Sequence, residues 1–327
     1  MIKNKYLFFF ILIFINLFFS YSYAANNFSE LPNVKIFIDE MVSKHQFKKT
    51  ELVKLFDTLK IKPNVTSNNK TPLEQKSWLT YRTIFVSEKR IQQGLDFWNK
   101  YEAILQKAQD TYGVPASIIV ATIGMETRYG QNSGQKPVFN SLATLAFGNS
   151  PRANFFRKEL EEFLLLTREQ HLDPRNVLGS YAGAIGQPQF MPSSYRNFAV
   201  NFSGNANIDL AHDWGDVIGS IANYYKKNGW VMGQPIAVPV SFIGGHYEFS
   251  MLHPKPITYS ELVQAGLAPA HATDQKSQLM ILRGYYSNEY WNIYKNFSVI
   301  KRYNHSDLYA MAVFQLSYYI SAARLNL

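Results

Sequence analysis

Helical periodicity covers most of this 327-residue chain and limits its fold more than any other feature. Apolar residues recur at spacings of three and four from Val34 to Leu59, from Trp78 to about Trp230 and again over Tyr309–Arg324. Clusters of glycine and proline interrupt the long middle stretch near 130–137, 148–151, 174–188 and 228–235. The pattern follows the helical period and not the strand period of two, so the sequence predicts a mainly α-helical protein.

The segment 233–297 departs from this pattern and is predicted to be a small β-containing insertion. Two runs of alternating apolar residues flank Gly244-Gly245, which is typical of a β-hairpin with a two-residue turn. The runs are Ile236, Val238, Val240 and Phe242 before the glycines, and Tyr247, Phe249 and Met251 after them. Thr258 and Glu261 have the spacing of a capping box, which predicts a short helix ending near Gly266. A further strand is expected at Leu279–Leu282.

The amino end has the three parts of a secretory signal. Lys3 and Lys5 precede an apolar run from Tyr6 to Phe19, and Ser22-Tyr23-Ala24 then offers a small-x-small cleavage site. The run is short for a membrane span, which needs about 20 apolar residues. We therefore favour a signal peptide over residues 1–24, with an uncleaved anchor as the alternative, and expect the mature chain to begin near Ala25.

Composition removes several classes of site and partner. The chain has no cysteine, which excludes disulfides, thiolate metal sites, cysteine nucleophiles and a lipoprotein anchored through cysteine. Its 33 Lys and Arg against 24 Asp and Glu give a net charge of +9, without a dense basic run. Export argues against nucleic acid as a partner, and the charge favours an anionic polymer of the cell envelope. The histidines form no H-x-x-x-H pair, so a zinc hydrolase is not supported.

The segment Gly113–Gly130 places a carboxylate on an apolar helix. Pro115 is expected at the first helical position and Gly130 just beyond the last. Ile119, Ile123 and Glu126 are then on one face, with Glu126 in the final turn. Burial and the negative end of the helix dipole both raise the pKa of a carboxyl there, which suits a general acid. The alternative is a structural Glu126 paired with Arg128 or another cation.

A second informative segment, Gly179–Tyr195, is rich in glycine. Three glycines within eight residues permit positive φ or close approach of the backbone. Ser180 and Gln189 add a hydroxyl and an amide that can hydrogen-bond a ligand. The alternative is a glycine-rich turn that opens a helix capped by Ser193 or Ser194.

Together these segments resemble the lytic murein transglycosylase B family. The resemblance rests on Met125-Glu-Thr-Arg-Tyr-Gly130 followed by the whole of Gly179–Tyr195. Further matching runs, in family order, are Trp78–Arg82, Phe97-Trp98, Ser150–Ala153, Asp216–Tyr224 and Arg302–Ser306. Several long, ordered motifs from about Trp78 to Arg324 make this resemblance specific.

The resemblance implies a lysozyme-like helical core around a groove for peptidoglycan glycan strands, in a periplasmic enzyme. Glu126 would be the single catalytic acid/base. It would protonate the oxygen leaving between N-acetylmuramic acid and N-acetylglucosamine, then accept a proton from the muramoyl 6-hydroxyl as a 1,6-anhydro ring closes without water. The sequence has no second carboxylate in a comparable motif. Cell-wall synthesis or hydrolysis enzymes are conceivable protein partners.

The resemblance also implies which side chains line the groove. Those near Glu126 would be Ser180, Gln189 and Phe190. Other positions that match groove residues are Tyr81, Arg152, Tyr224, Tyr303, Asn304 and Tyr309. Tyrosine faces can stack on sugars, and Arg152 can pair with a lactyl or stem-peptide carboxylate. For each tyrosine the alternative is ordinary packing.

A polar loop resembles the EF-hand-like calcium loop of the family. Its candidate ligands are Asn201, Ser203, Asn205, Asn207 and Asp209, with Asp216 as a late ligand. Asparagine replaces the usual aspartate at Asn201 and Asn205, and Ala206 replaces the expected glycine. These departures favour a loop held by its own asparagine hydrogen bonds over a calcium site, so no cofactor is expected to be required.

The resemblance gives a domain plan and leaves other functions open. The plan is a signal peptide at 1–24, an N-terminal helical region at 25–75, a lysozyme-like catalytic core at 76–232, the β-containing subdomain at 233–297 and a helical return to the core at 298–327. The alternatives to a lytic transglycosylase are a hydrolytic muramidase on the same fold and a noncatalytic peptidoglycan-binding protein. Only the hydrolase would leave reducing ends.

Overall fold

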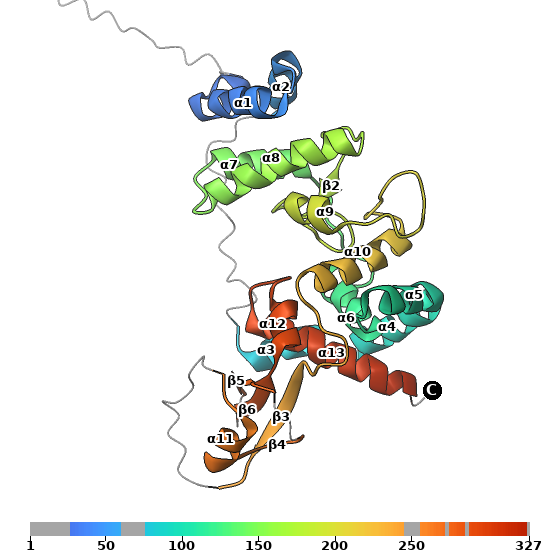
Figure 1. Ribbon diagram of the computed structural model, residues 1–327. Coiled ribbons are helices and arrows are strands. Elements are labelled where there is room, and N and C mark those ends of the chain that lie inside the picture. The colour runs from blue at the N-terminus through green and yellow to red at the C-terminus, as the bar shows by residue number, and fades with distance from the viewer. Residues whose placement is uncertain (1–26, 60–75, 245–255, 272–274, 285–287, 326–327) are drawn as a thin grey trace, which may run out of the picture. The chain divides into compact units, whose positions relative to one another are not determined.

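The computed structural model describes residues 27–59, 76–244, 256–271, 275–284 and 288–325 (Figure 1). The chain divides into two compact units, Met1–Lys62 and Pro63–Leu327. The predicted signal peptide and the second run of the predicted hairpin lie outside the described residues. Among the helices within them, none has both the length and the apolar character that crossing a membrane requires.

The first unit is a pair of helices preceded by one short 3₁₀ turn. Its elements are η1 (Phe28–Glu30), α1 (Pro32–His45) and α2 (Lys49–Phe56). The rings of Phe28 and Phe37 pack on Phe56, with centroids 6.3 and 5.9 Å away. Periodicity indicated one helical stretch here, but Gln46 takes a left-handed conformation (φ 59°) and ends α1. Neither glycine nor proline marks this break, so the sequence pattern did not reveal it.

In the second unit, the helical prediction for Trp78 to Trp230 is confirmed. The helices are α3 (Trp78–Phe85), α4 (Glu88–Lys100), α5 (Glu102–Tyr112), α6 (Ala116–Thr127), α7 (Val138–Phe147), α8 (Ala153–Glu169), α9 (Pro192–Phe198) and α10 (Trp214–Lys227). The breaks after α6, α7, α8 and α10 fall at the predicted glycine and proline clusters. Two short strands, β1 (Lys136–Pro137) and β2 (Leu178–Gly179), pair antiparallel.

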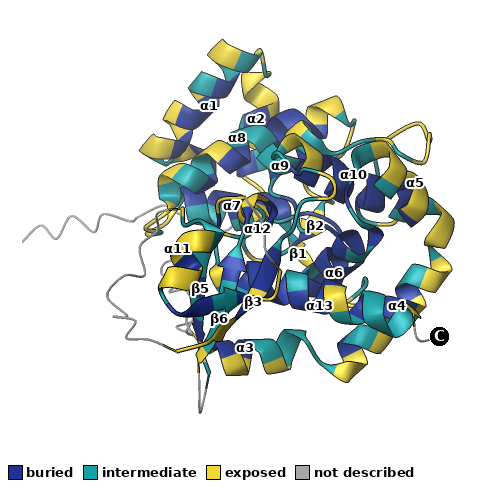
Figure 2. Cartoon of the chain, turned by 60° about the horizontal axis from the view of Figure 1, so that its bottom comes forward, coloured by how far each residue is buried: buried dark blue, intermediate teal, exposed yellow. Residues whose placement is uncertain are grey.

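Helix α6 is the most deeply buried helix of this region (Figure 2). Helices α4, α5, α10 and α13 (Asp307–Leu325) pack against it. All residues of α6 are buried except Ser117 and Glu126. The sequence predicted one apolar face, whereas the helix is apolar around its whole circumference, as a helix surrounded by others must be. Glu126 is therefore a half-buried carboxylate in the last turn of an otherwise apolar helix.

A four-stranded antiparallel sheet follows α10, in the order β4-β3-β6-β5. Its strands are β3 (Ala237–Phe242), β4 (Leu267–Pro269), β5 (Gln278–Arg283) and β6 (Asn288–Ile293). The predicted strand at Leu279–Leu282 is confirmed as β5. The predicted capping box is also confirmed, because Thr258 and Glu261 exchange hydrogen bonds at the start of α11 (Tyr259–Gln264). Strands β4 and β6 were not predicted.

Two tryptophans connect this sheet to the helical core. Glu289 of β6 accepts hydrogen bonds from the indoles of Trp78 (3.0 Å) and Trp291 (3.1 Å). The Trp291 ring also meets Phe314 of α13 edge-on, with centroids 6.0 Å apart. Helix α12 (Lys295–Lys301) then leads into α13, which packs on α3, α4 and α6. The predicted helical return over Tyr309–Arg324 is confirmed.

Candidate active site

Glu126 lies in the last turn of α6, as predicted. The helix ends because three residues in succession, Arg128, Tyr129 and Gly130, take positive φ values of 54°, 57° and 90°. The position predicted for Pro115 is wrong by one residue: it is the N-cap of α6 and not its first helical residue. Its φ of −57° still suits the start of a helix.

Tyr309 of α13 donates a hydrogen bond to Glu126. Its hydroxyl lies 2.6 Å from Glu126 Oε1, which is the short distance of a charge-assisted bond. Tyr309 is buried, and burial followed by the charge of Glu126 raises the pKa of its phenol well above the ordinary value. The hydroxyl therefore keeps its proton and acts as a permanent donor, which fixes the orientation of the carboxylate.

An aromatic cluster adjoins this pair. The ring of Tyr303 stacks on that of Tyr309 at 6.3 Å and contacts Tyr224 at 4.7 Å and Phe190 at 5.8 Å. The hydroxyl of Tyr303 donates to the carbonyl of Pro188 (2.6 Å), and that of Tyr224 to the carbonyl of Arg302 (2.7 Å). Burial and then the charge of Glu126 raise the pKa of Tyr303, and burial raises that of Tyr224 to about 12. Four predicted groove residues thus meet beside Glu126.

The glycine-rich segment folds into a tight loop. A Cβ on Gly179 would lie 2.1 Å from the carbonyl oxygen of Ala184, so only glycine fits there. The Ser180 hydroxyl accepts hydrogen bonds from the N–H groups of Ala182 (3.2 Å) and Ala184 (3.0 Å). Ser180 therefore holds the loop in shape, and its contact with a glycan stays a prediction.

Gln189 fastens this loop to the segment that follows α6. Its side-chain amide donates to the carbonyls of Ser133 (2.9 Å) and Gly186 (2.7 Å). Gln189 itself has a positive φ of 49°. The loop that carries Phe190 and the chain that leaves Glu126 are thereby held together.

The predicted cap of α9 is wrong. The N-cap is Met191, and Pro192 occupies the first turn. Ser193 donates its N–H (3.0 Å) and its hydroxyl (2.7 Å) to the buried carboxylate of Glu159 on α8. Ser193 thus joins α9 to α8 and caps neither helix.

Three predicted groove residues occupy other environments. Tyr81 is buried on α3, with its ring 4.5 Å from that of Phe85. Arg152 is exposed at the start of α8, with its guanidinium 4.2 Å from the Phe155 ring. Asn304 is half-buried in the turn after α12. Their contact with a glycan stays a prediction.

The sequence analysis missed Tyr225, which is fully buried beside the site. Its hydroxyl is 2.8 Å from that of Thr122 on α6, and its ring lies 5.7 Å from Tyr303. Burial raises the pKa of Tyr225, and the charge of Glu126 adds to the rise. Adjacent residues of a helix point in different directions. The family match at Tyr224 therefore did not indicate that Tyr225 also lies beside the site.

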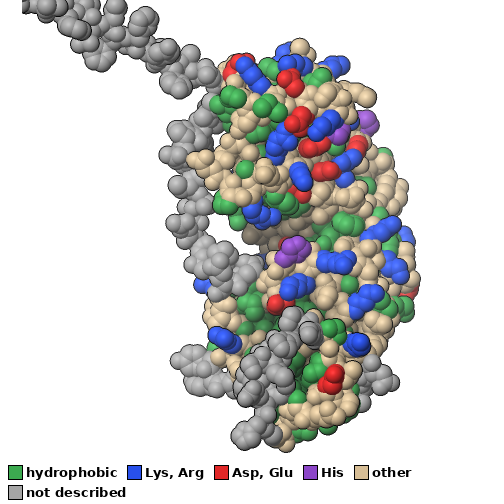
Figure 3. All heavy atoms as spheres, turned by 60° about the vertical axis from the view of Figure 1, so that its left-hand side comes forward, with side chains coloured by type: hydrophobic (Ala, Val, Ile, Leu, Met, Phe, Trp, Pro, Cys, Tyr) green, Lys and Arg blue, Asp and Glu red, His purple; other side chains and the backbone are tan. Residues whose placement is uncertain are grey.

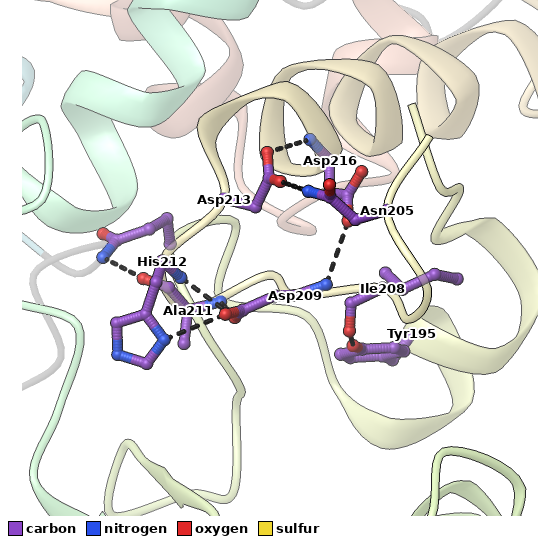
Figure 4. Close-up of polar contacts among 9 residues, drawn as sticks. Tyr195, Asn205, Ile208, Asp209, Ala211, His212, Asp213 and Asp216 are labelled. Atoms are coloured by element: carbon purple, nitrogen blue, oxygen red, sulfur yellow. Dashed lines mark hydrogen bonds and ion pairs between the residues drawn. The ribbon is translucent and has the colours of Figure 1, made fainter. Parts of the chain in front are cut away.

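The polar loop at 201–216 is organised around the carboxylates of Asp209, Asp213 and Asp216 (Figure 4). Asp216 is fully buried, and its two oxygens accept N–H groups of Phe202 (2.8 Å), Ser203 (3.0 Å) and Asp209 (3.0 Å). Asp213, which the sequence analysis did not name, is the N-cap of α10 and accepts the Ser203 hydroxyl at 2.6 Å. Its other oxygen accepts the Asn205 amide at 2.5 Å.

These contacts do not fit a calcium site. The Asn201 side chain accepts the N–H of Gly204 (2.8 Å) and donates to the carbonyl of Asn205. Carboxylate oxygens that point at N–H donors cannot offer the same lone pairs to a cation. Within the described part of the chain, no group of three or more His, Asp or Glu is placed to hold a metal ion. The loop is held instead by hydrogen bonds of its own side chains.

Known proteins match this chain over most of its length. The profile of the transglycosylase SLT domain matches residues 29–318. The membrane-bound lytic murein transglycosylase B of Escherichia coli (strain K12) is 41% identical over 317 residues, 92% of this chain and 86% of that protein. The E. coli lytic transglycosylase Slt35, solved in complex with calcium, has a TM-score of 0.82 at 41% identity, covering 91% of this chain and 96% of that one. SltB3 of Pseudomonas aeruginosa, solved with NAG-NAM-pentapeptide, has a TM-score of 0.77 at 27% identity, covering 87% and 78%.

The motifs around Glu126 and in the glycine-rich loop therefore indicated the correct relatives. The predicted mainly helical, lysozyme-like architecture is confirmed by the structural match. The chain belongs to the transglycosylase SLT domain family, with lytic murein transglycosylases among its relatives.

Proposed function

We propose that this protein is a peptidoglycan lytic transglycosylase in which Glu126 is the single general acid/base. The observation that carries the proposal is the Glu126 carboxylate on a buried helix, oriented by the phenol of Tyr309 at 2.6 Å. Its substrate would be the β-1,4 bond between N-acetylmuramic acid and N-acetylglucosamine. Membership of a family with lytic murein transglycosylases supports this substrate.

The hydrogen bond from Tyr309 assigns different tasks to the two oxygens of Glu126. Tyr309 donates to Oε1, so the proton of the neutral acid belongs on Oε2. Oε2–H would protonate the glycosidic oxygen as its bond to the muramoyl C1 breaks. The resulting carboxylate would take the proton of the muramoyl 6-hydroxyl while that oxygen bonds to C1. The 1,6-anhydro ring forms, no water is consumed, and Glu126 ends protonated as it began.

The positive charge that develops at C1 needs no second carboxylate in this scheme. Tyr225, Tyr303 and Tyr309 lie near Glu126. Burial raises the pKa values of their phenols, which therefore stay neutral. The acetamido group of the sugar itself can stabilise the cation, as in substrate-assisted glycosidases. This arrangement favours attack on C1 by the muramoyl 6-hydroxyl of the substrate itself.

Glycan strands are the proposed binding partner. A relative, SltB3, was solved with NAG-NAM-pentapeptide, which is a fragment of such a strand. Phe190 and Tyr224 are buried and pack against Tyr303, which is half-buried beside Glu126 and would offer its ring to a sugar. Arg152 would pair with a lactyl or stem-peptide carboxylate. Nucleic acid is not proposed, while enzymes of cell-wall synthesis or hydrolysis stay open as partners.

We propose a periplasmic location and no calcium requirement. The signal-like residues 1–24 support export, and the absence of cysteine rules out anchoring through a lipidated cysteine. Slt35 was solved with calcium, but in this chain the carboxylate oxygens of Asp213 and Asp216 face hydrogen-bond donors. Calcium therefore has no part in the proposed reaction.

Digestion of purified sacculi tests the function directly. The wild type and Glu126→Gln would be incubated with sacculi, and the released muropeptides identified by mass spectrometry. Glu289→Gln is the matched control, because Glu289 is also a half-buried carboxylate that accepts a hydrogen bond from an aromatic side chain, the indole of Trp78. We expect anhydro-muropeptides from the wild type and from Glu289→Gln, and none from Glu126→Gln.

Other outcomes would overturn the proposal. Reducing-end products from the wild type would make the protein a muramidase. Unchanged release by Glu126→Gln would remove the acid/base role of Glu126. No release by any of the proteins would favour a noncatalytic peptidoglycan-binding function.

A further inference from the structure

The turn directly after Glu126 has an unfavourable backbone. Arg128 and Tyr129 both take left-handed φ values, 54° and 57°, before Gly130 at 90°. Two consecutive residues with a Cβ adopt this conformation only where their surroundings enforce it, and such strain concentrates at functional sites. The side chains that enforce it here come from Tyr129 and from α4.

Tyr129 fills a space that two glycines leave open. A Cβ on Gly124 of α6 would lie 2.5 Å from the Tyr129 hydroxyl oxygen, and a Cβ on Gly94 of α4 would lie 2.7 Å from it. The ring contacts Phe97 at 5.7 Å, and the hydroxyl donates to the carbonyl of Arg90 at 3.0 Å. Burial raises the pKa of Tyr129, so this donor keeps its proton. Tyr129 therefore fastens the turn to α4.

Arg90 completes the same contact from α4. Its side chain is buried, and its guanidinium donates to the carbonyl of Gly124. That carbonyl would ordinarily accept the N–H of Arg128, but this N–H donates to Ile123 instead. Arg90 thus supplies the missing donor and places a cation at the negative end of the α6 dipole.

We propose that Tyr129 and Arg90 are positioning residues for Glu126, an inference that rests on the proposed function. They fix the backbone of the last turn of α6, whereas Tyr309 fixes the carboxylate at the far end of the side chain. Neither Tyr129 nor Arg90 needs to touch substrate. With both ends held, Oε2 keeps one position relative to the glycosidic oxygen.

Tyr129→Phe tests the positioning role, with Tyr195→Phe as the matched control. Tyr195 is also buried, and its hydroxyl also donates to a backbone carbonyl, that of Ile208 at 2.8 Å. Each variant keeps its ring and loses one such bond. The measurements are the melting temperature and the kcat and KM for release of anhydro products from soluble glycan strands.

We expect Tyr129→Phe to lower kcat by about tenfold or more, because small displacements of a catalytic group cost that much, with KM within about twofold of the wild type. Tyr195→Phe should lose a similar amount of thermal stability and keep the kcat of the wild type. Equal kcat values for the two variants would overturn the inference. A rise in KM alone for Tyr129→Phe would also overturn it.

Substitutions of Arg90 test the positioning role independently. Arg90→Lys keeps a cationic donor that can reach toward Gly124, whereas Arg90→Met keeps only the length of the side chain. We expect Arg90→Lys to retain more kcat than Arg90→Met at equal KM, and equal kcat values would contradict the role. If Arg90→Met does not fold, Tyr129→Phe and Arg90→Lys still decide the question. A wild type that makes no anhydro products would instead refute the proposed function.

Discussion

The hydrogen bond from Tyr309 to Glu126 predicts a specific kinetic defect in Tyr309→Phe. A hydrogen bond to a charged group contributes about 1.5–3 kcal/mol, and each 1.36 kcal/mol is tenfold in rate, so kcat should fall about 10- to 150-fold. The ring stays in place against Tyr303, so KM should stay within about twofold. Steady-state kinetics on soluble glycan strands measures both. A raised KM with unchanged kcat would mean that Tyr309 contacts the sugar and does not orient Glu126.

At the scale of single residues, the sequence predicted the chemistry of the site better than its contacts. Glu126 was singled out from its place on an apolar helix and from the family resemblance, which counted Tyr303 and Tyr309 among the groove residues without placing them beside it. The bond between Tyr309 and Glu126 was not predictable, because periodicity does not show which helices meet. Tyr129 stood in the same motif as Glu126, but nothing in the sequence shows that Gly94 and Gly124 make room for its side chain.

The loop that precedes α10 predicts a large loss of stability in Asp216→Asn. The buried carboxylate accepts three backbone N–H groups, and an asparagine NH₂ would oppose at least one of them. The free energy of unfolding should fall by about 2–3 kcal/mol, the cost of an unsatisfied buried group. Urea unfolding measures it. The control Asp96→Asn changes an exposed aspartate that accepts one side-chain bond from Gln92, and its effect should stay within about 0.5 kcal/mol.

Calcium distinguishes this explanation from a metal site. If hydrogen bonds hold the loop, neither added calcium nor a chelator should shift the melting temperature of the wild type. Calcium at 100 times its dissociation constant would otherwise stabilise the protein by about 2.7 kcal/mol. A clear shift would show that the oxygens of Asp213 and Asp216 can turn toward a cation.

The contact between α8 and α9 predicts a dependence of stability on pH. Burial raises the pKa of Glu159, and the hydrogen bonds from Ser193 oppose that rise only in part. The folded state therefore retains a proton that the unfolded chain loses near its ordinary pKa of about 4.3. Stability is fully present below that pH and falls as the pH rises through the pKa of the folded state.

Glu159→Gln should remove this dependence. Urea unfolding at pH 4.5 and pH 7 compares the two proteins, and the wild type should lose stability relative to the variant at the higher pH. The glutamine carbonyl can still accept a bond from Ser193, so the variant should fold. A wild type that gains stability relative to the variant between these pH values would contradict the prediction.

At the scale of elements, local signals were reliable where a single chemical rule applied. The capping box of Thr258 and Glu261 and the strand expected at Leu279–Leu282 were both confirmed. Strand β6 was missed because Asn288–Ile293 mixes polar and aromatic residues on both faces. One of the polar residues, Glu289, accepts hydrogen bonds from two indoles. The break at Gln46 was missed because a left-handed glutamine has no sequence signature.

The charge of the whole molecule predicts how it adsorbs to the cell wall. On the face shown in Figure 3, lysine and arginine side chains are scattered among acidic and apolar ones and form no dense patch. Residues 1–24 contain Lys3 and Lys5 and no acidic residue, so the proposed mature protein keeps a net charge of +7, two less than the full chain. This charge attracts an anionic polymer, and salt screens the attraction beyond about 10 Å at 0.1 M. Binding of the inactive Glu126→Gln protein to sacculi should therefore weaken steadily as sodium chloride is raised. Binding that does not respond to salt would assign retention to the groove alone.

The hydrogen bond between Tyr309 and Glu126 also affects when the active site can form during folding. It joins residues 183 positions apart within the second unit, Pro63–Leu327. In a chain that leaves a translocation channel with its amino end first, Glu126 emerges long before its partner. Contacts of such long range form late in folding. In the export that we propose, the Glu126–Tyr309 hydrogen bond and the packing of α13 on α6 would be completed only after residue 309 has crossed the membrane.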